Sequence, residues 1–126
     1  MKLQNSLYTI DHRGQDGGAW CYQITLDSTH VIYQAHFPEQ PITPGVCIIQ
    51  IAKELLEDAL QQPLDVSRIK NVKFLSVISP KETSTVTYVI SKLSEDGADY
   101  KAIVEVKAGQ TTLAKISFVC SKHEGN

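Results

Sequence analysis

A histidine, three prolines and a glycine lie close together in the segment HFPEQPITPGVCIIQ, residues 36 to 50. His36 opens the segment and Gly45 follows nine residues later. Prolines restrict the backbone, so the loop between them is predicted to be rigid. If a helix begins near Gly45, its first N–H groups lack partners within the helix and can stabilise an oxyanion. A base beside such donors can remove a proton next to a carbonyl. The alternative is that His36 only forms hydrogen bonds within the loop.

The helix required by this hypothesis is predicted over roughly residues 44 to 61. Thr43 is a suitable N-cap, Pro44 suits the first helical position, and Gly45 then falls at the second, where a ligand can approach its N–H closely. Apolar residues recur at helical spacing and cover most of the helix girth, which predicts a buried helix. They are Val46, Ile48, Ile49, Ile51, Ala52, Leu55, Leu56, Ala59 and Leu60.

Strand patterns occupy most of the remaining chain. The segments SLYTIDHR and AWCYQITLD precede the prolines, and THVIYQAHF is also predicted to be extended. Strand-like segments 66–78, 83–93 and 99–119 follow the helix, and the turn AGQT divides the last into a hairpin. About six strands and one buried helix predict a single α+β domain over residues 1–126, with an antiparallel sheet curled around the helix. The tail, about residues 122–126, is expected to fray.

Composition narrows the possible partners and location. The chain has 126 residues, a formal net charge of -2 and a sequence pI near 6.0, which disfavours nucleic acid and anionic membranes. It lacks the pattern of a signal peptide or a transmembrane segment. Three cysteines without paired spacing indicate reduced thiols in the core of a cytoplasmic protein. The histidines show no metal-ligand spacing, so no metal site is predicted.

The proline segment resembles the signature of the β-hydroxyacyl-[acyl carrier protein] dehydratases of fatty acid synthesis. The matching residues are His36-Phe37-Pro38, Pro41 and Pro44-Gly45-Val46. The stretch KFLSVISPKE, residues 73–82, and the final hairpin resemble the same family in order and length. The resemblance implies the hotdog fold, dimerisation through the sheets and reversible dehydration of 3-hydroxyacyl thioesters to trans-2-enoyl thioesters. It implies no metal or other cofactor, since phosphopantetheine enters with the substrate.

The resemblance also assigns roles within the site. His36 corresponds to the base, the Gly45 N–H polarises the thioester carbonyl, and Phe37, Pro44 and Val46 lie in the substrate-binding segment. The family's acid lies fourteen residues after the histidine, where this chain has Gln50.

A glutamine cannot give up a proton as a carboxylic acid does. Glu54 lies one turn later on the same helical face, where the family commonly has glutamine. We therefore expect Glu54 to supply the acid and Gln50 to support it. Glu54 as an ordinary solvated residue is one alternative, and an acid supplied by a different hotdog chain in a mixed dimer is another.

A basic stretch contains Arg68, Lys70, Lys73 and Lys81. It is a candidate docking site for an acidic acyl carrier protein, although a solvated strand face has the same pattern. The thioester carrier is accordingly expected to be acyl carrier protein or coenzyme A. Two other functions remain open for a hotdog chain: thioester hydrolysis, and a catalytically incomplete subunit paired with an active homologue.

Overall fold

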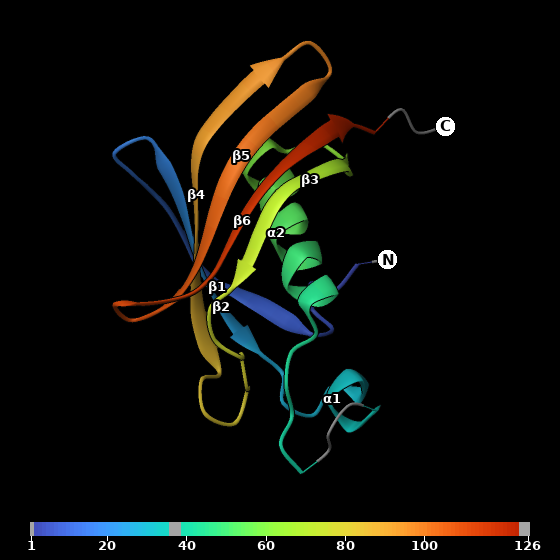
Figure 1. The fold of residues 1–126 in the computed structure, drawn as a ribbon, viewed down its shortest axis with the longest axis vertical. Coiled ribbons are helices and arrows are strands. Elements are labelled where there is room, and N and C mark those ends of the chain that lie inside the picture. Colours follow the sequence, from blue (N-terminus) through green and yellow to red (C-terminus); the bar gives the residue numbers. More distant parts are fainter. Residues whose placement is uncertain (1, 36–38, 124–126) are drawn as a thin grey trace.

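The computed structural model describes residues 2–35 and 39–123, which form one sheet and two helices (Figure 1). The sheet strands are β1 (Tyr8–Asp16), β2 (Ala19–Leu26), β3 (Leu64–Phe74), β4 (Thr85–Asp96), β5 (Asp99–Ala108) and β6 (Thr111–Lys122). The helices are α1 (Val31–Ala35) and α2 (Gly45–Leu60). No helix in the described part of the chain is long and apolar enough to cross a membrane.

The six strands form one antiparallel sheet in the order β1-β2-β4-β5-β6-β3. The sheet curves around α2, and β1 and β3 are its two edges (Figure 1). Along β2, β5 and β6 alternating side chains are buried toward the helix, as the register of a half-buried sheet requires. The predicted α+β architecture, an antiparallel sheet around one long helix, is confirmed.

Helix α2 is buried along most of its girth, as its apolar pattern predicts. Its buried residues are Cys47, Ile48, Ile51, Ala52, Glu54, Leu55 and Leu56. On the sheet, Tyr88, Val104 and Phe118 are among the residues that complete the same core. Burying each large aliphatic side chain contributes about 1.5 to 3 kcal/mol, so the packing of α2 against the inner sheet face contributes much of the stability of the fold.

The start of α2 differs from the prediction by one residue. The N-cap is Pro44, so Gly45 occupies the first helical position rather than the second. The prediction of Thr43 as N-cap is wrong, because its hydroxyl is instead hydrogen-bonded to the buried Tyr33 hydroxyl at 2.8 Å. Its backbone N–H donates to the Ile78 carbonyl at 2.8 Å. Thr43 therefore ties the loop to the core and does not compete for the N–H groups of the helix.

The segment before the prolines was predicted to be extended, but Val31–Ala35 forms the short helix α1. The Asp27 carboxylate accepts the Thr29 N–H at 2.9 Å, and His30 Nδ1 accepts the Ile32 N–H at 3.0 Å. These two side chains satisfy backbone donors at the start of the turn, and local bonds of this kind outweigh the β propensity of Val31 and Ile32.

Strand β3 contains two irregularities opposite β6, between Val66 and Arg68 and between Ile69 and Asn71. Strict alternation from Leu64 would place Arg68 and Lys70 on the helix side of the sheet. Instead Ile69 pairs with the buried Phe118, and Arg68 pairs with Val119 on the outer side. The two bulges therefore turn the basic residues away from the core and restore the inward phase at Val72 and Phe74.

The end of β6 is held further than expected. Lys122 is in the strand, and the His123 N–H donates to the Pro63 carbonyl at 3.0 Å. The His123 ring also contacts Asp65 at 2.7 Å. The ordered strand thus extends into the segment that was expected to fray.

Candidate functional site

The start of α2 presents backbone donors without a side-chain cap. Pro44 has φ -61° and ψ 145°, and its carbonyl accepts the N–H groups of Cys47 at 3.0 Å and Ile48 at 3.1 Å. Within the described residues, the N–H groups of Gly45 and Val46 have no hydrogen-bond acceptor. These two donors give the helix start its capacity to bind an anion or a developing oxyanion.

Buried hydroxyl groups fix this helix start. The Tyr88 hydroxyl donates to the Ile48 carbonyl at 3.1 Å, and the pair of Thr43 and Tyr33 anchors the preceding loop. Burial raises the pKa of both tyrosine hydroxyls, so they remain neutral hydrogen-bonding groups. The position of Gly45 is thus set by the sheet and by α1.

An apolar pocket of about 400 Å³ opens beside Gly45. Its wall consists mainly of the end of β3 and the residues that follow, together with the loop before α2. The lining residues are Ile42, Thr43, Gly45, Ile48, Phe74, Leu75, Ser76, Val77 and Ile78. An apolar cavity with a few backbone donors at one end suits a hydrophobic chain that carries a polar carbonyl group.

The ring of Phe74 lies directly against Gly45. A Cβ atom placed on Gly45 would lie 2.8 and 2.9 Å from two ring carbons, which is closer than side chains pack. A side chain at position 45 would therefore have to displace this ring, and Phe74 is itself 48% exposed. Phe74 thus lines the pocket and covers the start of the helix.

Two of the predicted site residues, His36 and Phe37, lie outside the described residues. The roles expected for them stay predictions. Pro44 and Val46 flank Gly45, and the Val46 side chain is 76% exposed at the helix start. The exposed Leu75 and Val77 form an apolar edge of the pocket.

The structure brings Gln50 and Glu54 together on α2. The Gln50 Nε2 donates to Glu54 Oε2 at 2.7 Å. The Glu54 carboxylate also accepts the Leu3 N–H at 2.8 Å, the Gln4 N–H at 2.9 Å and the Tyr8 hydroxyl at 2.9 Å. Glu54 is only 3% exposed, so the solvated alternative is wrong. A buried carboxylate requires such partners, and here the N-terminal segment supplies three of the four.

These contacts set a condition for the acid role of Glu54. Four donors occupy about as many acceptor positions as a carboxylate offers, so one must leave before a substrate hydroxyl can bind. Glu54 also lies nine residues from Gly45, about 14 Å along the helix axis. The assignment of Glu54 as the acid therefore stays a prediction. Burial, and then the charge of Glu54, raise the pKa of Tyr8, which remains a donor to the carboxylate.

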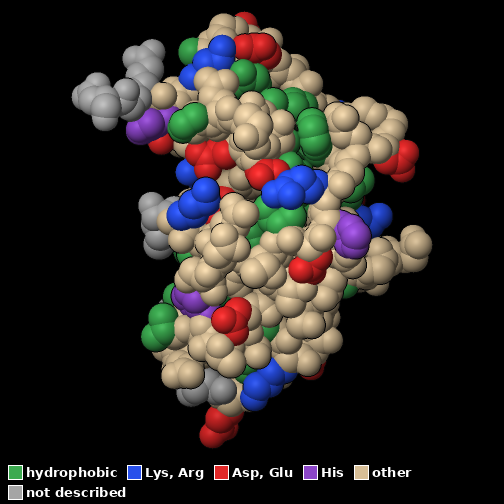
Figure 2. Space-filling view, turned by 180° about the vertical axis from the view of Figure 1, so that it is seen from behind, with side chains coloured by type: hydrophobic (Ala, Val, Ile, Leu, Met, Phe, Trp, Pro, Cys, Tyr) green, Lys and Arg blue, Asp and Glu red, His purple; other side chains and the backbone are tan. Residues whose placement is uncertain are grey.

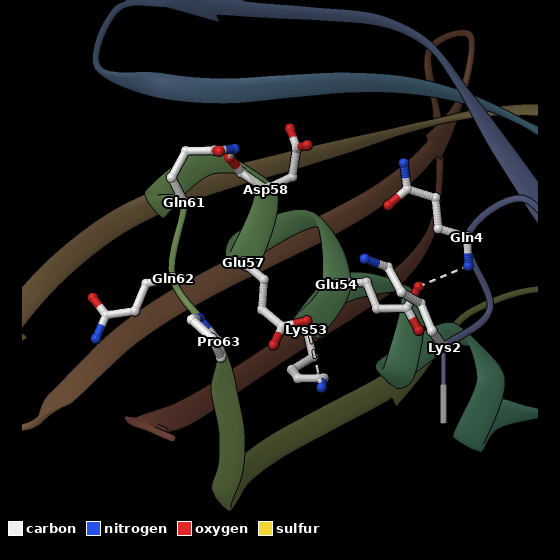
Figure 3. Close-up of a pocket in the computed structure, with 9 residues that line it drawn as sticks. All are labelled: Lys2, Gln4, Lys53, Glu54, Glu57, Asp58, Gln61, Gln62 and Pro63. Carbon is white, nitrogen blue, oxygen red and sulfur yellow. Dashed lines mark hydrogen bonds and ion pairs between the residues drawn. The ribbon is translucent and has the colours of Figure 1, made fainter. Parts of the chain in front are cut away.

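A polar groove of about 570 Å³ runs beside the second half of α2 (Figure 3). It is lined by Lys2, Gln4, Lys53, Glu54, Glu57, Asp58, Gln61, Gln62 and Pro63. Most of its charged groups have structural partners: Glu57 accepts the Leu64 N–H at 2.8 Å, and Lys53 lies 3.4 Å from Glu57. Asp58 is bound by Arg13 and by the Tyr22 hydroxyl, and these contacts lower the pKa of Asp58. The groove joins α2 to neighbouring elements, and its contacts suit that structural role.

Neither the three cysteines nor the basic residues of β3 line the pocket beside Gly45. All three cysteines are free, Cys47 and Cys120 are buried, and burial raises the pKa of Cys120 to about 12. The prediction of core cysteines is confirmed for these two and is wrong for Cys21, which is only partly buried. Arg68, Lys70 and Lys73 are exposed on β3, away from the inner face that holds the pocket.

Sequence reasoning missed the N-terminal segment as a partner of α2. Leu3 and Leu7 are buried, and the backbone of Leu3 and Gln4 binds a side chain about fifty residues away. The signal available in the sequence was the carboxylate of Glu54 within an otherwise apolar helix, since a buried charge needs donors.

This geometry defines the class of the protein as the hotdog fold: a curved antiparallel sheet around one long helix, with a glycine at the helix start. Residues 12–117 match the model of the ApeI-like family, described as ApeI dehydratase. The chain therefore belongs to the ApeI-like dehydratase family. The resemblance to acyl-thioester dehydratases is thereby confirmed.

Two similar proteins are 3-hydroxyacyl-[acyl-carrier-protein] dehydratases FabZ. The one from Ruminiclostridium cellulolyticum is 32% identical over 77% of this chain and 73% of its own length. The one from Latilactobacillus sakei is 26% identical over 70% of this chain and 68% of its own length. Among solved structures, the dehydratase heterocomplex ApeI:P from Xenorhabdus doucetiae has a similar fold, with a TM-score of 0.70 and 23% identity over 90% of this chain and 96% of that chain.

Substituting Glu54 tests its function as an anchor. In Glu54→Gln a single amide oxygen replaces the carboxylate and can accept only two of the four hydrogen bonds. We expect the free energy of unfolding, measured with urea, to fall by about 3 kcal/mol because buried donors lose their acceptor. Hydrogen exchange at the Leu3 and Gln4 amides should accelerate.

The matched control is Glu82→Gln, which removes the same charge from an exposed position. Its free energy of unfolding should change by less than about 0.5 kcal/mol. Equal stability of the Glu54 and Glu82 variants would contradict the anchoring role.

Proposed function

We propose that this chain catalyses the reversible dehydration of 3-hydroxyacyl thioesters to trans-2-enoyl thioesters. The observation that carries the proposal is the uncapped start of α2, where Gly45 lines an apolar pocket in a chain of a dehydratase family. The named FabZ relatives act on 3-hydroxyacyl groups linked to acyl carrier protein, which supports the same substrate class here.

In the proposed reaction His36 removes the proton at C2 of the substrate. Negative charge then develops on the thioester oxygen, and the Gly45 N–H donates a hydrogen bond to it. The C3–O bond breaks, and the departing hydroxide takes a proton from an acid to leave as water. The electron pair of the C2–H bond becomes the new double bond between C2 and C3.

The wall of the pocket supports an acyl group as the ligand. Ile42, Ile48, Phe74, Leu75 and Val77 supply apolar surface next to the helix start. A neutral thioester carbonyl beside Gly45 would gain a donor, while the hydrocarbon chain would lie against the apolar wall. The free thiols of the three cysteines suit the reducing conditions of the cytoplasm, where we place the reaction.

The source of the acid distinguishes two versions of the proposal. In the first, Glu54 of the same chain donates the proton after one of its four hydrogen bonds opens. In the second, a different hotdog chain supplies the acid and this chain supplies His36 and Gly45. Gln50 at the family's acid position, together with the full set of donors on Glu54, favours the second version.

A mixed dimer requires a surface on which the partner can add. Strand β3 is an eleven-residue edge of the sheet, with Ile69 and Phe74 each about half exposed. Long edge strands with apolar side chains are usually covered in native proteins. We propose that β3 is where this chain dimerises, with itself or with the acid-bearing hotdog chain.

Hydration of a trans-2-enoyl thioester by the purified chain tests the function directly. The conjugated thioester absorbs in the ultraviolet and the hydrated product does not, so we expect absorbance to fall without release of thiol. A His36→Ala variant should lose this activity. Thiol release would instead indicate a thioesterase, and no reaction by a folded chain would mean that a partner is required or that the proposal is wrong.

Exchanging the residues at 50 and 54 tests the source of the acid. The double variant Gln50→Glu, Glu54→Gln restores the order that is common in the family while keeping an amide–carboxylate pair. If a partner normally supplies the acid, hydration by the variant alone should rise by about 100-fold, a typical contribution of a positioned acid. If Glu54 is the acid, the rate should stay level or fall. Urea unfolding of the variant shows whether the fold has survived.

Substituting Gly45 tests the oxyanion site. In Gly45→Ala the added methyl group meets the Phe74 ring and obstructs approach to the N–H, so the hydration rate should fall at least about tenfold. The control is Gly14→Ala, because a Cβ at Gly14 meets no atom within 4 Å. In the double variant Gly45→Ala, Phe74→Leu the smaller side chain removes the overlap with the ring. A rate that stays low in this variant then reports obstruction of the N–H by the added methyl group. Unchanged activity of Gly45→Ala would contradict the role of its N–H.

A further inference from the structure

The outer face of the sheet carries a concentration of basic side chains, which we name the outer basic face. In the strand register, Lys101 and Arg68 flank Val119, and Lys115 and Lys73 lie side by side two outward positions further along, with Glu105 on the other side of Lys115. Lys92 lines the same shallow groove of about 340 Å³ as Lys73 and Lys115. With Lys107, six of the chain's 12 lysine and arginine residues lie on this face, although the chain is acidic overall.

These six cations have no ion-pair partners among the described residues. The ion pairs that the described chain does form involve Arg13, Lys53, Lys122 and His123, all away from the six. Glu105 is the acid within the groove, and its carboxylate accepts a hydrogen bond from the Thr112 hydroxyl at 3.3 Å. The positive charge of this face is therefore available to an external partner.

Acids at the far end of the same face are already engaged. Asp65 lies 2.7 Å from the His123 ring, and Asp99 accepts the Ser121 hydroxyl at 2.7 Å. Glu95 pairs with the buried Tyr100 and so lies on the inner side of the sheet, where it forms an ion pair with Lys122 at 2.9 Å. On the face of the molecule that Figure 2 shows, acidic and basic side chains are interspersed. The separation of charge is thus a feature of the sheet's outer face.

We propose that the outer basic face docks an acidic carrier protein that presents the acyl thioester to the pocket. This inference rests on the proposed function, because the carrier brings the substrate. The sequence had suggested Arg68, Lys70, Lys73 and Lys81 for this role. Lys81 lies between β3 and β4, and the outer basic face instead extends across β5 and β6 to Lys101 and Lys115.

The dimensions of the face favour a protein partner. Rows of side chains on neighbouring strands lie about 5 Å apart, and successive outward residues of a strand about 7 Å apart. The six cations therefore spread over roughly 20 Å, so a single phosphate group could contact only two or three of them. A protein surface with several carboxylates matches this spread, and long-range attraction would also speed the encounter.

The end of β3 connects the docking face with the pocket. Lys73 points outward beside Lys115, while the next residue, Phe74, points inward over Gly45. The pocket wall continues through Leu75, Ser76, Val77 and Ile78 around this end of the strand. A flexible arm attached to a carrier on the outer face can therefore pass the strand end and reach the helix start.

Binding of a carrier protein that lacks its acyl arm tests the docking face without requiring catalysis. Fluorescence anisotropy of a labelled, purified acidic acyl carrier protein would compare wild type with Lys73→Glu, Lys115→Glu. We expect the Kd of the double variant to rise at least about tenfold, and wild-type binding to weaken in high salt. The control is Lys2→Glu, Arg13→Glu, which makes the same charge change away from the outer basic face and should leave the Kd unchanged.

The kinetic comparison uses one enoyl chain on two carriers. For the thioester on carrier protein, the KM of Lys73→Glu, Lys115→Glu should rise about tenfold, and for the uncharged N-acetylcysteamine thioester it should not change. Equal effects on both substrates, no carrier binding by wild type, or equal binding by all three proteins would overturn the proposal. Comparable binding to phosphatidylglycerol vesicles or duplex DNA would also overturn it.

The two proposals fail separately. If wild type hydrates neither thioester but binds the carrier through Lys73 and Lys115, the proposed reaction fails and the docking face stands. If it hydrates both thioesters and the double variant binds the carrier as wild type does, the reaction stands and the docking face fails.

Discussion

The structure depends on the burial of α2, a helix that is apolar around most of its girth. A flat sheet would cover only one side of such a helix, so the sheet must curve until strands on both sides contact it. The curvature brings the end of β3 to the first turn of α2, which places Phe74 against Gly45. The same arrangement leaves β1 and β3 as the two edges. The shape of the candidate site therefore follows from how the core is packed.

One acidic residue in this core imposes a second requirement. A carboxylate in an apolar interior is costly unless donors replace its water, and Glu54 obtains them from Gln50, Tyr8 and the backbone of Leu3 and Gln4. The N-terminal segment is thus fastened to α2 by a charge. If the glutamine and the acid have exchanged places in this chain, the acid has moved from the position expected to face the substrate to one where it supports the fold. Because Gln50 cannot donate that proton, the proposed dehydration then needs an acid from another group.

Local patterns were sufficient for the elements whose structure depends on near neighbours. Short stretches of sequence predict the apolar period of α2, the hairpin of β5 and β6 and the turns between strands. The short helix α1 was missed because side chains of Asp27 and His30 cap it, and these bonds compete with the β propensity of Val31 and Ile32. The role of Thr43 was missed because its partner Tyr33 comes from another element. The contacts of Glu54 span about fifty residues, and no local pattern predicts contacts of that range.

Strand β3 shows how one short sequence can serve two faces of a sheet. In strict alternation, LDVSRIKNVKF would direct Arg68 and Lys70 toward the helix, where unpaired charges are costly. The two bulges insert Ile69 into the inward series and turn Arg68 outward to join Lys101 across Val119. After the second bulge the inward phase resumes, so Lys73 and Phe74 occupy opposite faces at the strand end. A loss of either bulge alone would reverse this last pair, placing a lysine over Gly45 and a phenylalanine among the outer cations. The register of β3 therefore couples the proposed docking face to the proposed pocket: both depend on the same two irregularities in one strand.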